Sequence, residues 1–437
     1  MSMDKDVLTG LDRYEEFLKK LEAEILKMDG YRIAIVYSDI KHFKYINDTY
    51  GYQRGDMLLK EFVHRVIENN ESLLCAARVY SDNIVVARKL PKDMSAEDFR
   101  IMVSEINLAL EAEFREKYLD RRLKFCTGIN ILEKDDKDLN AETAVSDANL
   151  ARKVAKKMDD DCVLLFGRWM VENIEKEVEI TSYLSTAIEK GELKVYYQPK
   201  IESTSKSIIG AEALVRWQKP DGKFIFPDEF IPLVERSGQI VDVDYFVYKE
   251  VFRFIAERLA QGKEVVPISM NVSRVHLHKM DILSYVSSLF EEFQVPPHLV
   301  EFEMTESIYI DNTQQALELI NGLHKLGTTV SMDDFGSGYS SLNLLSRLPI
   351  DVIKMDRVFL KKDELQENDR IIISCVIDMA KKLKMTSLCE GVETLEQSDY
   401  LAQIGCEIQQ GFYFSKPIPE SEFIEFMDNY QIEQAPA

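Results

Sequence analysis

The sequence predicts an α/β protein with two domains, an N-terminal helix-flanked sheet and a C-terminal, TIM-like (β/α)₈ barrel. Two observations support this fold class. Apolar runs of β type alternate with stretches of helical spacing along the chain, which favours sheets covered by helices. In the second half, eight such runs fall within about 250 residues, the usual size of one barrel. The length of 437 residues also suits two or three domains.

The first domain is predicted to span residues 1–166. Apolar residues at helical spacing indicate a helix over 11–28, and the β-type run 31–37 leads to Asp39. The apolar stretch 73–80 continues after a polar break into 83–87, which is typical of a strand–turn–strand hairpin. The elements predicted after this hairpin are a helix over 97–116, a strand over 124–132 and a basic helix over 141–157.

A single helix over residues 167–190 is predicted to connect the two domains. It is rich in Glu and Lys, and one face carries Met170, Ile174, Val178 and Leu184. Because no linker rich in Gly, Ser or Pro occurs here, we expect a rigid connector through which regulatory coupling can run.

The second domain is predicted to span residues 191–430. Its candidate strands are 193–197, 208–217, 265–271, 300–304, 328–332, 352–355, 386–389 and 408–414. The helices predicted between them include 244–261, 280–293, 313–326, 369–383 and 395–404. In a barrel the carboxyl ends of parallel strands meet on one face, and barrel enzymes place their chemistry there.

Polar side chains gather at the ends of these predicted strands. Asp333 and Asp334 follow the fifth strand, and this pair taken alone also fits a solvated turn in front of a helix. The other members of the set are Glu212, Asn271, Glu303, Lys354, Glu390 and Gln410. Since carboxylates at close range repel one another, their meeting on one face indicates a divalent metal, and oxygen ligands suit Mg²⁺ or Mn²⁺.

Two groups near this set allow a simpler interpretation. Lys354 also fits a plain salt-bridge partner of the carboxylates rather than a group with its own role in catalysis. His276, His278 and His324 lie outside the set, and we expect them at the surface or in helix caps rather than as ligands.

The composition restricts the class of partner. A formal net charge of −22 argues against nucleic-acid polymers and anionic membranes, because like charges repel. Six cysteines are scattered without a CxxC pair, which fits neither a zinc cluster nor a disulfide framework. The first residues lack the apolar core of a signal peptide, and no run reaches membrane-spanning length. We therefore expect a cytoplasmic protein, in which metals or local Arg and Lys must reverse the field for any anionic ligand.

The second half of the chain resembles the EAL domain family. The motifs that carry the resemblance are Tyr197-Gln198-Pro199, Glu212-Ala213-Leu214-Val215-Arg216-Trp217, Glu303-Met304-Thr305-Glu306-Ser307, Asp333-Asp334-Phe335-Gly336, Ile353-Lys354-Met355-Asp356, Glu390-Gly391-Val392-Glu393 and Gln410-Gly411-Phe412. The resemblance implies hydrolysis of cyclic di-GMP to linear pGpG with two metal ions. The alternative is a receptor that binds cyclic di-GMP without hydrolysis and acts through a protein partner. Such a receptor could lose a metal ligand or Lys354 freely, whereas this chain keeps them all.

The EAL resemblance also implies a role for each matching residue. Glu212, Asn271, Glu303 and Asp333 would ligate the first metal, and Asp333 would bridge to a second metal that Asp334 also holds. Lys354 would contact the attacking water or its metal, Glu390 would bind metal-held water, and Gln410 would orient the site. Gln198 and Arg216 would contact the substrate, the arginine through phosphate. Glu306 would anchor the loop 335–342, which shapes the second-metal site and a contact in an expected homodimer.

The first domain resembles the GGDEF domain of diguanylate cyclases, a nucleotidyl-cyclase-like fold. The motifs are Asp6-Val7-Leu8-Thr9-Gly10-Leu11, Ser38-Asp39-Ile40, Phe43-Lys44-Tyr45-Ile46-Asn47-Asp48 and Gly55-Asp56. By this resemblance Asn47 and Asp56 would bind the guanine of GTP, while Asp39 and Asp82 would hold metal. The signature departs from the family, however, since Tyr80-Ser81-Asp82-Asn83-Ile84 replaces Gly-Gly-Asp-Glu-Phe.

Several departures predict a degenerate domain without cyclase activity. Loss of the two glycines places side chains where backbone should approach a ligand, and Tyr80 would fill that space. Lys41 replaces an acidic residue, and the acidic run 159–161 lies where the family has a basic phosphate contact. Whether the domain binds GTP as a regulatory ligand or serves only as a dimerising or folding module is left open by the sequence.

Overall fold

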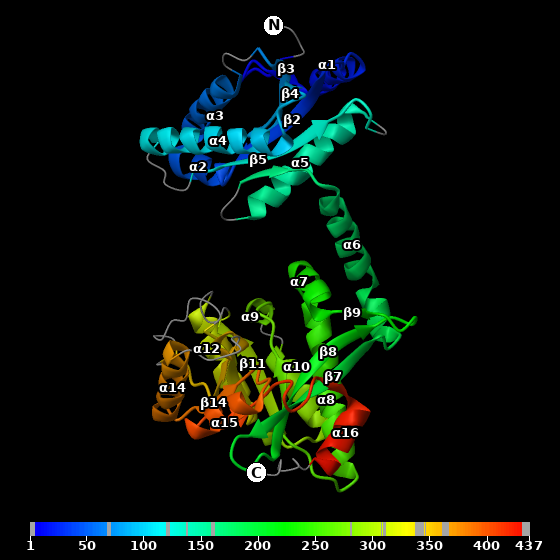
Figure 1. The fold of residues 1–437 in the computed structure, drawn as a ribbon, viewed down its shortest axis with the longest axis vertical. Helices are drawn as coiled ribbons and strands as arrows, with labels where there is room; N and C mark the ends of the chain where they lie inside the picture. The colour runs from blue at the N-terminus through cyan, green and yellow to red at the C-terminus, as the bar shows by residue number, and fades with distance from the viewer. Residues whose placement is uncertain are drawn as a thin grey trace. The chain divides into compact units, whose positions relative to one another are not determined.

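The computed structural model describes residues 5–67, 71–118, 123–136, 139–158, 162–279, 282–306, 308, 312–336, 345, 347–360 and 367–430. The chain divides into two compact units, Met1–Lys176 and Glu177–Ala437. Each unit has its own sheet, as Figure 1 shows, and its own hydrophobic core. The predicted α/β fold class, with a sheet domain followed by a barrel domain, is confirmed.

In the described part of the first unit, six strands form one sheet in the order β1-β3-β4-β2-β5-β6. The strands are β1 Asp12–Arg13, β2 Tyr31–Ile40, β3 Leu73–Tyr80, β4 Asn83–Pro91, β5 Phe125–Leu132 and β6 Val163–Leu165. The helices are α1 Tyr14–Leu26, α2 Phe43–Tyr50, α3 Tyr52–Ile67, α4 Ala96–Tyr118 and α5 Ala141–Lys157. The predicted hairpin is the antiparallel pair β3 and β4, whose turn consists of Ser81 and Asp82.

Helices cover both faces of this sheet. On one face α2 and α3 pack with α4 around Phe43, Phe62 and Phe125, and the rings of Phe62 and Phe125 stack with centroids 4.4 Å apart. On the other face α1 and α5 pack against β2, β3 and β4 around Phe17 and Tyr37. Both faces of β2 are therefore buried, which explains its nearly continuous apolar run.

A glycine controls how closely α5 approaches the sheet. A Cβ added to Gly128 of β5 would lie 2.0 Å from the carbonyl oxygen of Ala148 and 2.1 Å from the backbone nitrogen of Arg152. The helix backbone thus packs directly on β5, and no larger residue fits between them. This contact brings the last turns of α5 next to the end of β2.

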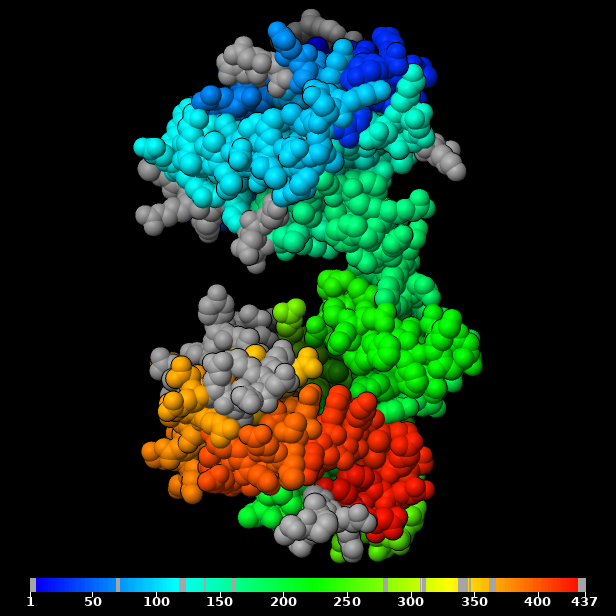
Figure 2. Space-filling view, viewed as in Figure 1, coloured from blue at the N-terminus to red at the C-terminus, as the bar shows by residue number. Residues whose placement is uncertain are grey.

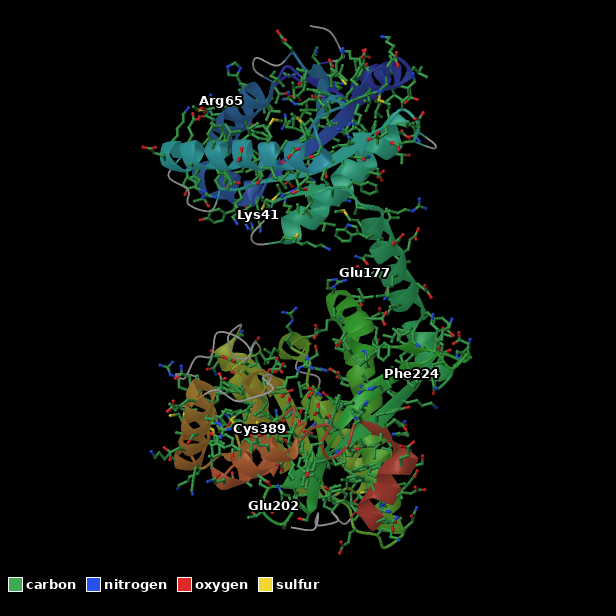
Figure 3. All side chains as sticks on the ribbon, viewed as in Figure 1. Lys41, Arg65, Glu177, Glu202, Phe224 and Cys389 are labelled. Carbon is green, nitrogen blue, oxygen red and sulfur yellow. The ribbon has the colours of Figure 1, made fainter. Side chains whose placement is uncertain are left out.

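One helix, α6 Arg168–Glu189, leads from the first unit into the second. It matches the predicted connecting helix within one residue at each end. The division between the compact units falls inside α6, at Lys176 and Glu177, and Figure 3 labels Glu177. The helix therefore contributes residues to both units.

In the described part of the second unit, eight strands close into a barrel in the order β7-β8-β10-β11-β12-β13-β14-β15, with β15 pairing back to β7. Their bounds are β7 Leu193–Glu202, β8 Ile208–Gln218, β10 Ile268–Asn271, β11 Val300–Thr305, β12 Thr329–Phe335, β13 Val352–Met355, β14 Thr386–Cys389 and β15 Ile408–Gln409. Two short strands, β9 Phe224–Ile225 and β16 Ile418–Pro419, extend the sheet. The predicted barrel is thus confirmed.

Helices surround the barrel and bury its outer face. They are α7 Pro227–Ser237, α8 Ile240–Ala260, α9 His276–Lys279, α10 Ile282–Phe293, α12 Thr313–Leu326, α14 Glu367–Lys382, α15 Leu395–Gln403 and α16 Glu420–Asn429, with single 3₁₀ turns at Pro297–Leu299 and Arg357–Leu360. Apolar residues of α8, α10 and α12 form the largest cluster with β10, β11 and β12. None of the helices within the described ranges is long and apolar enough to cross a membrane.

Two features of the barrel differ from the simple alternating pattern. Strand β7 runs antiparallel to both of its neighbours, β8 and β15. The five residues between Glu202 and Ile208 are too few for a parallel crossover, which needs about a dozen residues, so β7 and β8 form a hairpin. Glu202, labelled in Figure 3, therefore ends β7 beside Ile408, the first residue of β15.

The last barrel strand is also much shorter than the predicted range 408–414. It ends at Gln409, after which the backbone nitrogens of Phe414 and Ser415 both bond to the carbonyl oxygen of Gly411 in a turn. A Cβ at Gly411 would lie 2.1 Å from the carbonyl oxygen of Val392, so this turn packs directly on the chain after β14. The prediction of a longer strand was wrong because apolar Phe412 to Phe414 belong to this turn.

Candidate functional site

The predicted site residues meet at one end of the barrel. Asn271, the last residue of β10, pairs directly with Glu303 of β11, and Thr305 pairs with Asp333 of β12. Glu212 lies on β8, Lys354 on β13 and Glu390 directly after β14, while Gln410 follows the end of β15. The parallel register therefore gathers side chains that are far apart in the sequence.

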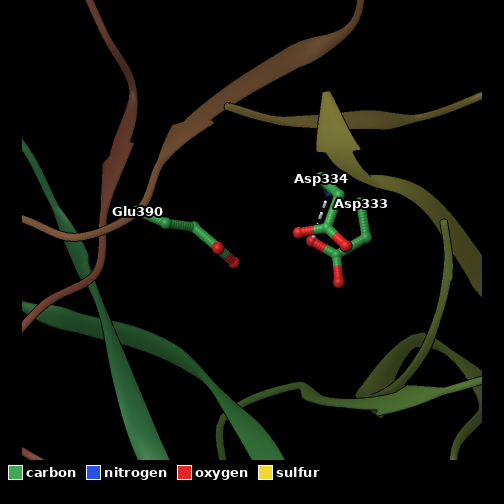
Figure 4. Close-up of side chains that lie close together, drawn as sticks. All are labelled: Asp333, Asp334 and Glu390. Atoms are coloured by element: carbon green, nitrogen blue, oxygen red, sulfur yellow. Dashed lines mark hydrogen bonds between the residues drawn. The ribbon is translucent and has the colours of Figure 1, made fainter. Parts of the chain in front are cut away.

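An irregularity in β12 turns both aspartates toward the same space. The pairing of β12 with β13 shifts between Met332 and Phe335, and Asp334 has φ of 57°, in the left-handed region. Bulges of this kind re-aim side chains next to active sites. Figure 4 shows Asp333, Asp334 and Glu390 pointing toward one another, with the backbone nitrogen of Asp334 donating to Asp333 Oδ1 at 2.9 Å. Asp333 is buried, so the alternative of a solvated turn is wrong for this residue.

Lys354 lies at the centre of the carboxylates. Its Nζ is 3.0 Å from Asp333, 2.8 Å from Glu390 and 3.6 Å from Glu212, and it also donates to Glu303 Oε2. The side chain is completely buried. Burial alone would lower the pKa of the lysine, but the surrounding carboxylates raise it well above the usual value, so the ammonium stays charged.

Amide side chains hold Glu212 in place. Asn271 Nδ2 donates to Glu212 Oε1 at 3.1 Å, and Gln410 Nε2 donates to Glu212 Oε2 at 2.7 Å. Gln410 also donates to Gln198 Oε1 at 3.2 Å, and Gln198 in turn donates to the carbonyl oxygen of Ser415. Both oxygens of Glu212 are therefore oriented before any ligand arrives.

The electrostatics of this cluster favour an added cation. Burial, together with neighbouring carboxylates, raises the pKa of Glu390 to about 8 and that of Asp334 to about 6. Oxygens of Asp333, Asp334 and Glu390 all lie within 4.8 Å of one another, close enough to share one ion. Among the described residues, the buried Oε1 of Gln410 has no hydrogen-bond partner. An all-oxygen set of this kind fits Mg²⁺ or Mn²⁺.

A cavity of about 530 Å³ opens beside the carboxylates. Asn271 and Asp334 line it, so the candidate metal ligands face this space directly. The charged and polar residues that share its wall are Arg216, Glu235, Asp244, Ser273, Arg274 and Thr305, and the apolar ones include Leu214, Pro227 and Ile231. Figure 2 shows the surface of the second unit hollowed between its green and orange segments.

A histidine that we expected at the surface contacts Asp244, which lines the cavity. His276 is fully buried, its Nε2 lies 2.9 Å from Asp244 Oδ2, and its ring packs near Tyr245 and Tyr248. The expectation was wrong because Leu277, the next residue of α9, packs into the hydrophobic core of the second unit and draws this turn inward. Asp244 also accepts from the backbone nitrogen of Ser273, which fixes the loop after Asn271.

The candidate site of the first unit has a different balance of charge. Asp39, at the end of β2, is buried, and its Oδ2 accepts hydrogen bonds from both Arg152 and Lys156 of α5. Arg152 is held in addition by Asn149 Oδ1, at 3.0 Å from Nε and 2.8 Å from Nη2, and lies over the ring of Tyr37. Two cations of the chain itself therefore occupy one oxygen of the carboxylate predicted to hold metal.

The signature segment of the first unit lies in the β3–β4 turn. Asp82 is buried, its Oδ2 accepts from the backbone nitrogen of Ile40 at 2.9 Å, and burial raises its pKa. Ser81 has φ of 49°, a conformation that glycine adopts without strain. Tyr80 is 58% exposed, so the expectation that its ring fills the site was wrong. The acidic run 159–161 lies outside the described residues.

The predicted guanine contacts lie on the helices that follow β2. Asn47 is on α2 and Asp56 is on α3, and both are partly buried. A Cβ at Gly55 would lie 1.9 Å from Asn47 Oδ1, so the glycine lets the two helices bring Asn47 and Asp56 together. Their contact with a base stays a prediction.

Comparison with known protein families agrees with the two halves of the structure. A family model described as EAL domain matches residues 182–417, which is more than half of the chain. The chain belongs to the EAL domain family. A second model, described as diguanylate cyclase, GGDEF domain, matches residues 3–161, so a GGDEF domain precedes the EAL domain, as predicted.

Curated relatives match this chain over nearly its whole length. The chain is 30% identical to the cyclic di-GMP phosphodiesterase NbdA of Pseudomonas aeruginosa over 99% of its length and 55% of the relative. It is 30% identical to the cyclic di-GMP phosphodiesterase PdeR of Escherichia coli over 97% of its length and 63% of the relative. The chain thus spans little more than half the length of these relatives.

Solved structures resemble the EAL domain. One, described as PaMucR phosphodiesterase in complex with c-di-GMP, is 32% identical with a TM-score of 0.53 and covers 56% of this chain and 99% of that chain. An EAL domain protein from Listeria monocytogenes is 28% identical with a TM-score of 0.50 and covers 57% of this chain and 97% of that chain. In the present EAL domain, Glu306 is buried next to the site, while residues 337–342 of the loop it would anchor lie outside the described residues.

Proposed function

We propose that the EAL domain hydrolyses cyclic di-GMP to linear pGpG with two divalent ions, Mg²⁺ or Mn²⁺, at each site. The observation that carries the proposal is the cluster of Asp333, Asp334 and Glu390 around a shared space at the edge of the cavity. Water would add at phosphorus, the P–O3′ bond of one phosphodiester would break, and the product would carry a 5′-phosphate. The names of the curated relatives and of the similar solved structure support this substrate.

The residues that would hold the ions are those of the cluster. Glu212, Asn271, Glu303 and Asp333 would ligate the first ion, and Asp333 and Asp334 the second. The ions would supply positive charge that stabilises the negative charge developing at the phosphodiester. Asn271 and Gln410 already orient Glu212, so little rearrangement of its carboxylate is needed.

Other side chains of the site would bind the substrate or hold the carboxylates in place. Arg216 lines the cavity and presents a planar guanidinium suited to a phosphate, while Gln198 lies behind Gln410. Lys354 keeps Asp333, Glu303 and Glu390 in one arrangement through its central ammonium. Arg216 and Arg274 also provide local positive charge for a dianionic ligand in a chain whose net charge is −22.

We favour an enzyme over a receptor because each residue with a predicted role in the metal site is present and lies at the same end of the barrel. A receptor that only holds cyclic di-GMP has no physical need for a cluster of carboxylates that repel one another and the phosphates of the ligand. The amide contacts to Glu212 and the central Lys354 would likewise serve no purpose in binding alone.

For the GGDEF domain, we propose that it makes no cyclic di-GMP. Diguanylate cyclases need a metal at Asp39, and here Arg152 and Lys156 neutralise this carboxylate. GTP would act at most as a regulatory ligand bound through Asn47 and Asp56. Isothermal titration of the full chain with GTP tests this point, and an absence of binding would leave a dimerising or folding module.

The decisive test is incubation of the full chain with cyclic di-GMP and Mg²⁺ or Mn²⁺, with chromatography of the products. We expect pGpG to accumulate, and the Asp333→Asn variant to be slower by more than about 100-fold, since even partners of metal ligands cost about 10- to 100-fold. Asp242→Asn changes an exposed aspartate of α8 and is the matched control, expected to keep the wild-type rate. Binding of cyclic di-GMP without any product would establish the receptor instead.

Two further expectations concern the whole protein. We propose that it forms a homodimer and acts in the cytoplasm on a soluble dinucleotide. Light scattering after size-exclusion chromatography would give the oligomeric state, and a monomer at micromolar concentration would contradict the first expectation.

A further inference from the structure

A second buried lysine lies inside the barrel, and it has no role in the site described so far. Lys200 of β7 is 3% exposed. Its Nζ lies 2.9 Å from Glu303 Oε1 and 3.1 Å from Glu301 Oε1. Both glutamates are on β11, two residues apart, so they share the face of the strand that points into the barrel.

The lysine reaches across the interior of the barrel. In the strand order, β8 and β10 lie between β7 and β11, so the contact from Lys200 to Glu303 does not join neighbouring strands. Lys200 stands opposite Gly210 of β8, and a Cβ there would lie 3.5 Å from Lys200 Cδ, so the aliphatic chain of the lysine packs over this glycine. The barrel packing therefore directs the ammonium to β11.

The two lysines of the barrel hold Glu303 from both of its oxygens. Lys200 donates to Oε1 and Lys354 donates to Oε2. Although burial opposes ionisation, these two ammonium groups lower the pKa of Glu303 to about 2. Glu303 thus keeps one orientation and a full negative charge in the centre of the barrel.

We infer that Lys200 is a positioning residue for the metal site, which fixes Glu303 through Oε1 in the geometry that the first ion requires. The inference rests on the proposed function, because it takes Glu303 as a metal ligand. Partners that orient a ligand in this way commonly change metal affinity by about 10- to 100-fold. Lys200 bears a like charge to the ion, so a role as a simple counter-charge would predict the opposite effect, tighter metal binding when the lysine is removed.

The test is a titration of the metal-free full chain with Mn²⁺. Electron paramagnetic resonance measures the bound fraction at a temperature well below that of unfolding. We expect Lys200→Met to weaken binding of the first ion by about 10-fold or more. Glu301→Gln is the matched control, because it removes the negative charge of the other partner of Lys200 and leaves the bond to Glu303. This control should keep the wild-type affinity within about threefold. An unchanged or tighter affinity in Lys200→Met would overturn the inference.

A second variant covers the case in which Lys200→Met does not fold. Lys200→Gln can still donate to Glu303 but lacks the charge, and it should show an intermediate affinity. If both variants fold only when Mn²⁺ is present, the ion replaces Lys200 as a counter-charge and the inference fails; it also fails if both remain unfolded with Mn²⁺, because Lys200 then serves the fold. Failure of the wild-type chain to bind Mn²⁺ at all would instead defeat the proposed function.

Discussion

The two domains each place aspartates at the end of a central strand, but they neutralise them in different ways. In the GGDEF domain, Asp39 meets Arg152 and Lys156 from α5, so cations of the chain balance the carboxylate. In the EAL domain, Lys354 and Lys200 are surrounded by a larger number of carboxylates, which leaves excess negative charge beside a cavity. The first arrangement is complete without metal, whereas the second gains from an added cation.

The difference teaches that an acidic strand end does not by itself make a metal site. The deciding factor is which side chains a neighbouring helix brings to the carboxylate. In the GGDEF domain this helix is α5, and Gly128 lets it lie directly on β5. Four experiments test this contrast, and they follow from the largest expected effect to the smallest.

Metal removal should affect the EAL domain and leave the GGDEF domain unchanged. We expect dialysis against EDTA to reduce hydrolysis of cyclic di-GMP to the uncatalysed rate and Mn²⁺ to restore it. Hydrogen exchange followed by mass spectrometry should show that Mn²⁺ increases protection at the ends of β8, β12 and β14, because ligand binding stabilises the native state. Peptides from β2 and α5 should be unaffected. Equal protection of both domains would break the contrast.

Removal of the central lysine should destabilise the EAL domain strongly. Lys354→Met leaves Glu303, Asp333 and Glu390 without their shared cation, and uncompensated buried charge costs about 3–5 kcal/mol. Urea unfolding in EDTA would measure this loss of free energy. The surface variant Lys219→Met, which loses an exposed pair with Glu179, should change stability by less than about 1 kcal/mol. A similar small change for Lys354→Met would contradict the proposed charge balance.

Removal of the Arg152 guanidinium should make the stability of the GGDEF domain depend on metal. Arg152→Met leaves Asp39 with Lys156 alone, and we expect a loss of about 1–3 kcal/mol in EDTA. Since Oδ1 of Asp39 already lacks a partner among the described residues, Mn²⁺ should recover part of this loss. Urea unfolding with and without Mn²⁺ measures the change in the free energy of unfolding. Hydrogen exchange of β2 peptides shows whether the ion binds near Asp39. No recovery with Mn²⁺ would show that Arg152 does not exclude an ion.

The smallest effect is expected in the signature turn. Ser81→Gly should stabilise the chain by up to about 1 kcal/mol. A left-handed conformation costs a non-glycine residue about 1–2 kcal/mol, and the larger conformational entropy of glycine in the unfolded chain offsets part of this gain. The variant should still make no cyclic di-GMP from GTP, since Arg152 remains. Ser182→Gly, inside α6, should instead lose about 0.5 kcal/mol. Cyclase activity in Ser81→Gly would mean that the turn, and not Asp39, silences the domain.

Much of the fold could be predicted from patterns within short stretches. The helix Thr313–Leu326 was predicted with its observed bounds, and the strands Val352–Met355 and Thr386–Cys389 likewise, because apolar periodicity and capping act locally. The direction of β7 was missed because strand pairing depends on partners far along the chain. The early end of β15 was missed because apolar Phe412 to Phe414 resemble a strand although they form a turn.

In the candidate site too, local patterns could be predicted from the sequence, whereas contacts between remote elements could not. Strand ends in a barrel converge by geometry, so Asp333, Glu303 and Glu390 could be grouped from the sequence alone. Lys200, Arg152 and the buried pair of Asp244 with His276 could not, because each depends on a contact between elements that are remote in the sequence. One signal was available for Lys200, since it lies two residues after Gln198 and so on the same face of its strand.

The antiparallel strand β7 has a consequence for how the EAL domain folds. Its hairpin with β8 joins residues that are close in the chain and can form early, but its pairing with β15 joins Glu202 to Ile408. Loop closure over such a distance is slow, and contacts of long sequence separation form late. The barrel should therefore remain an open sheet, with the edge of the hairpin unpaired, until the last strand has been synthesised. Ribosome-bound chains that end before β15 should expose this edge to chaperones.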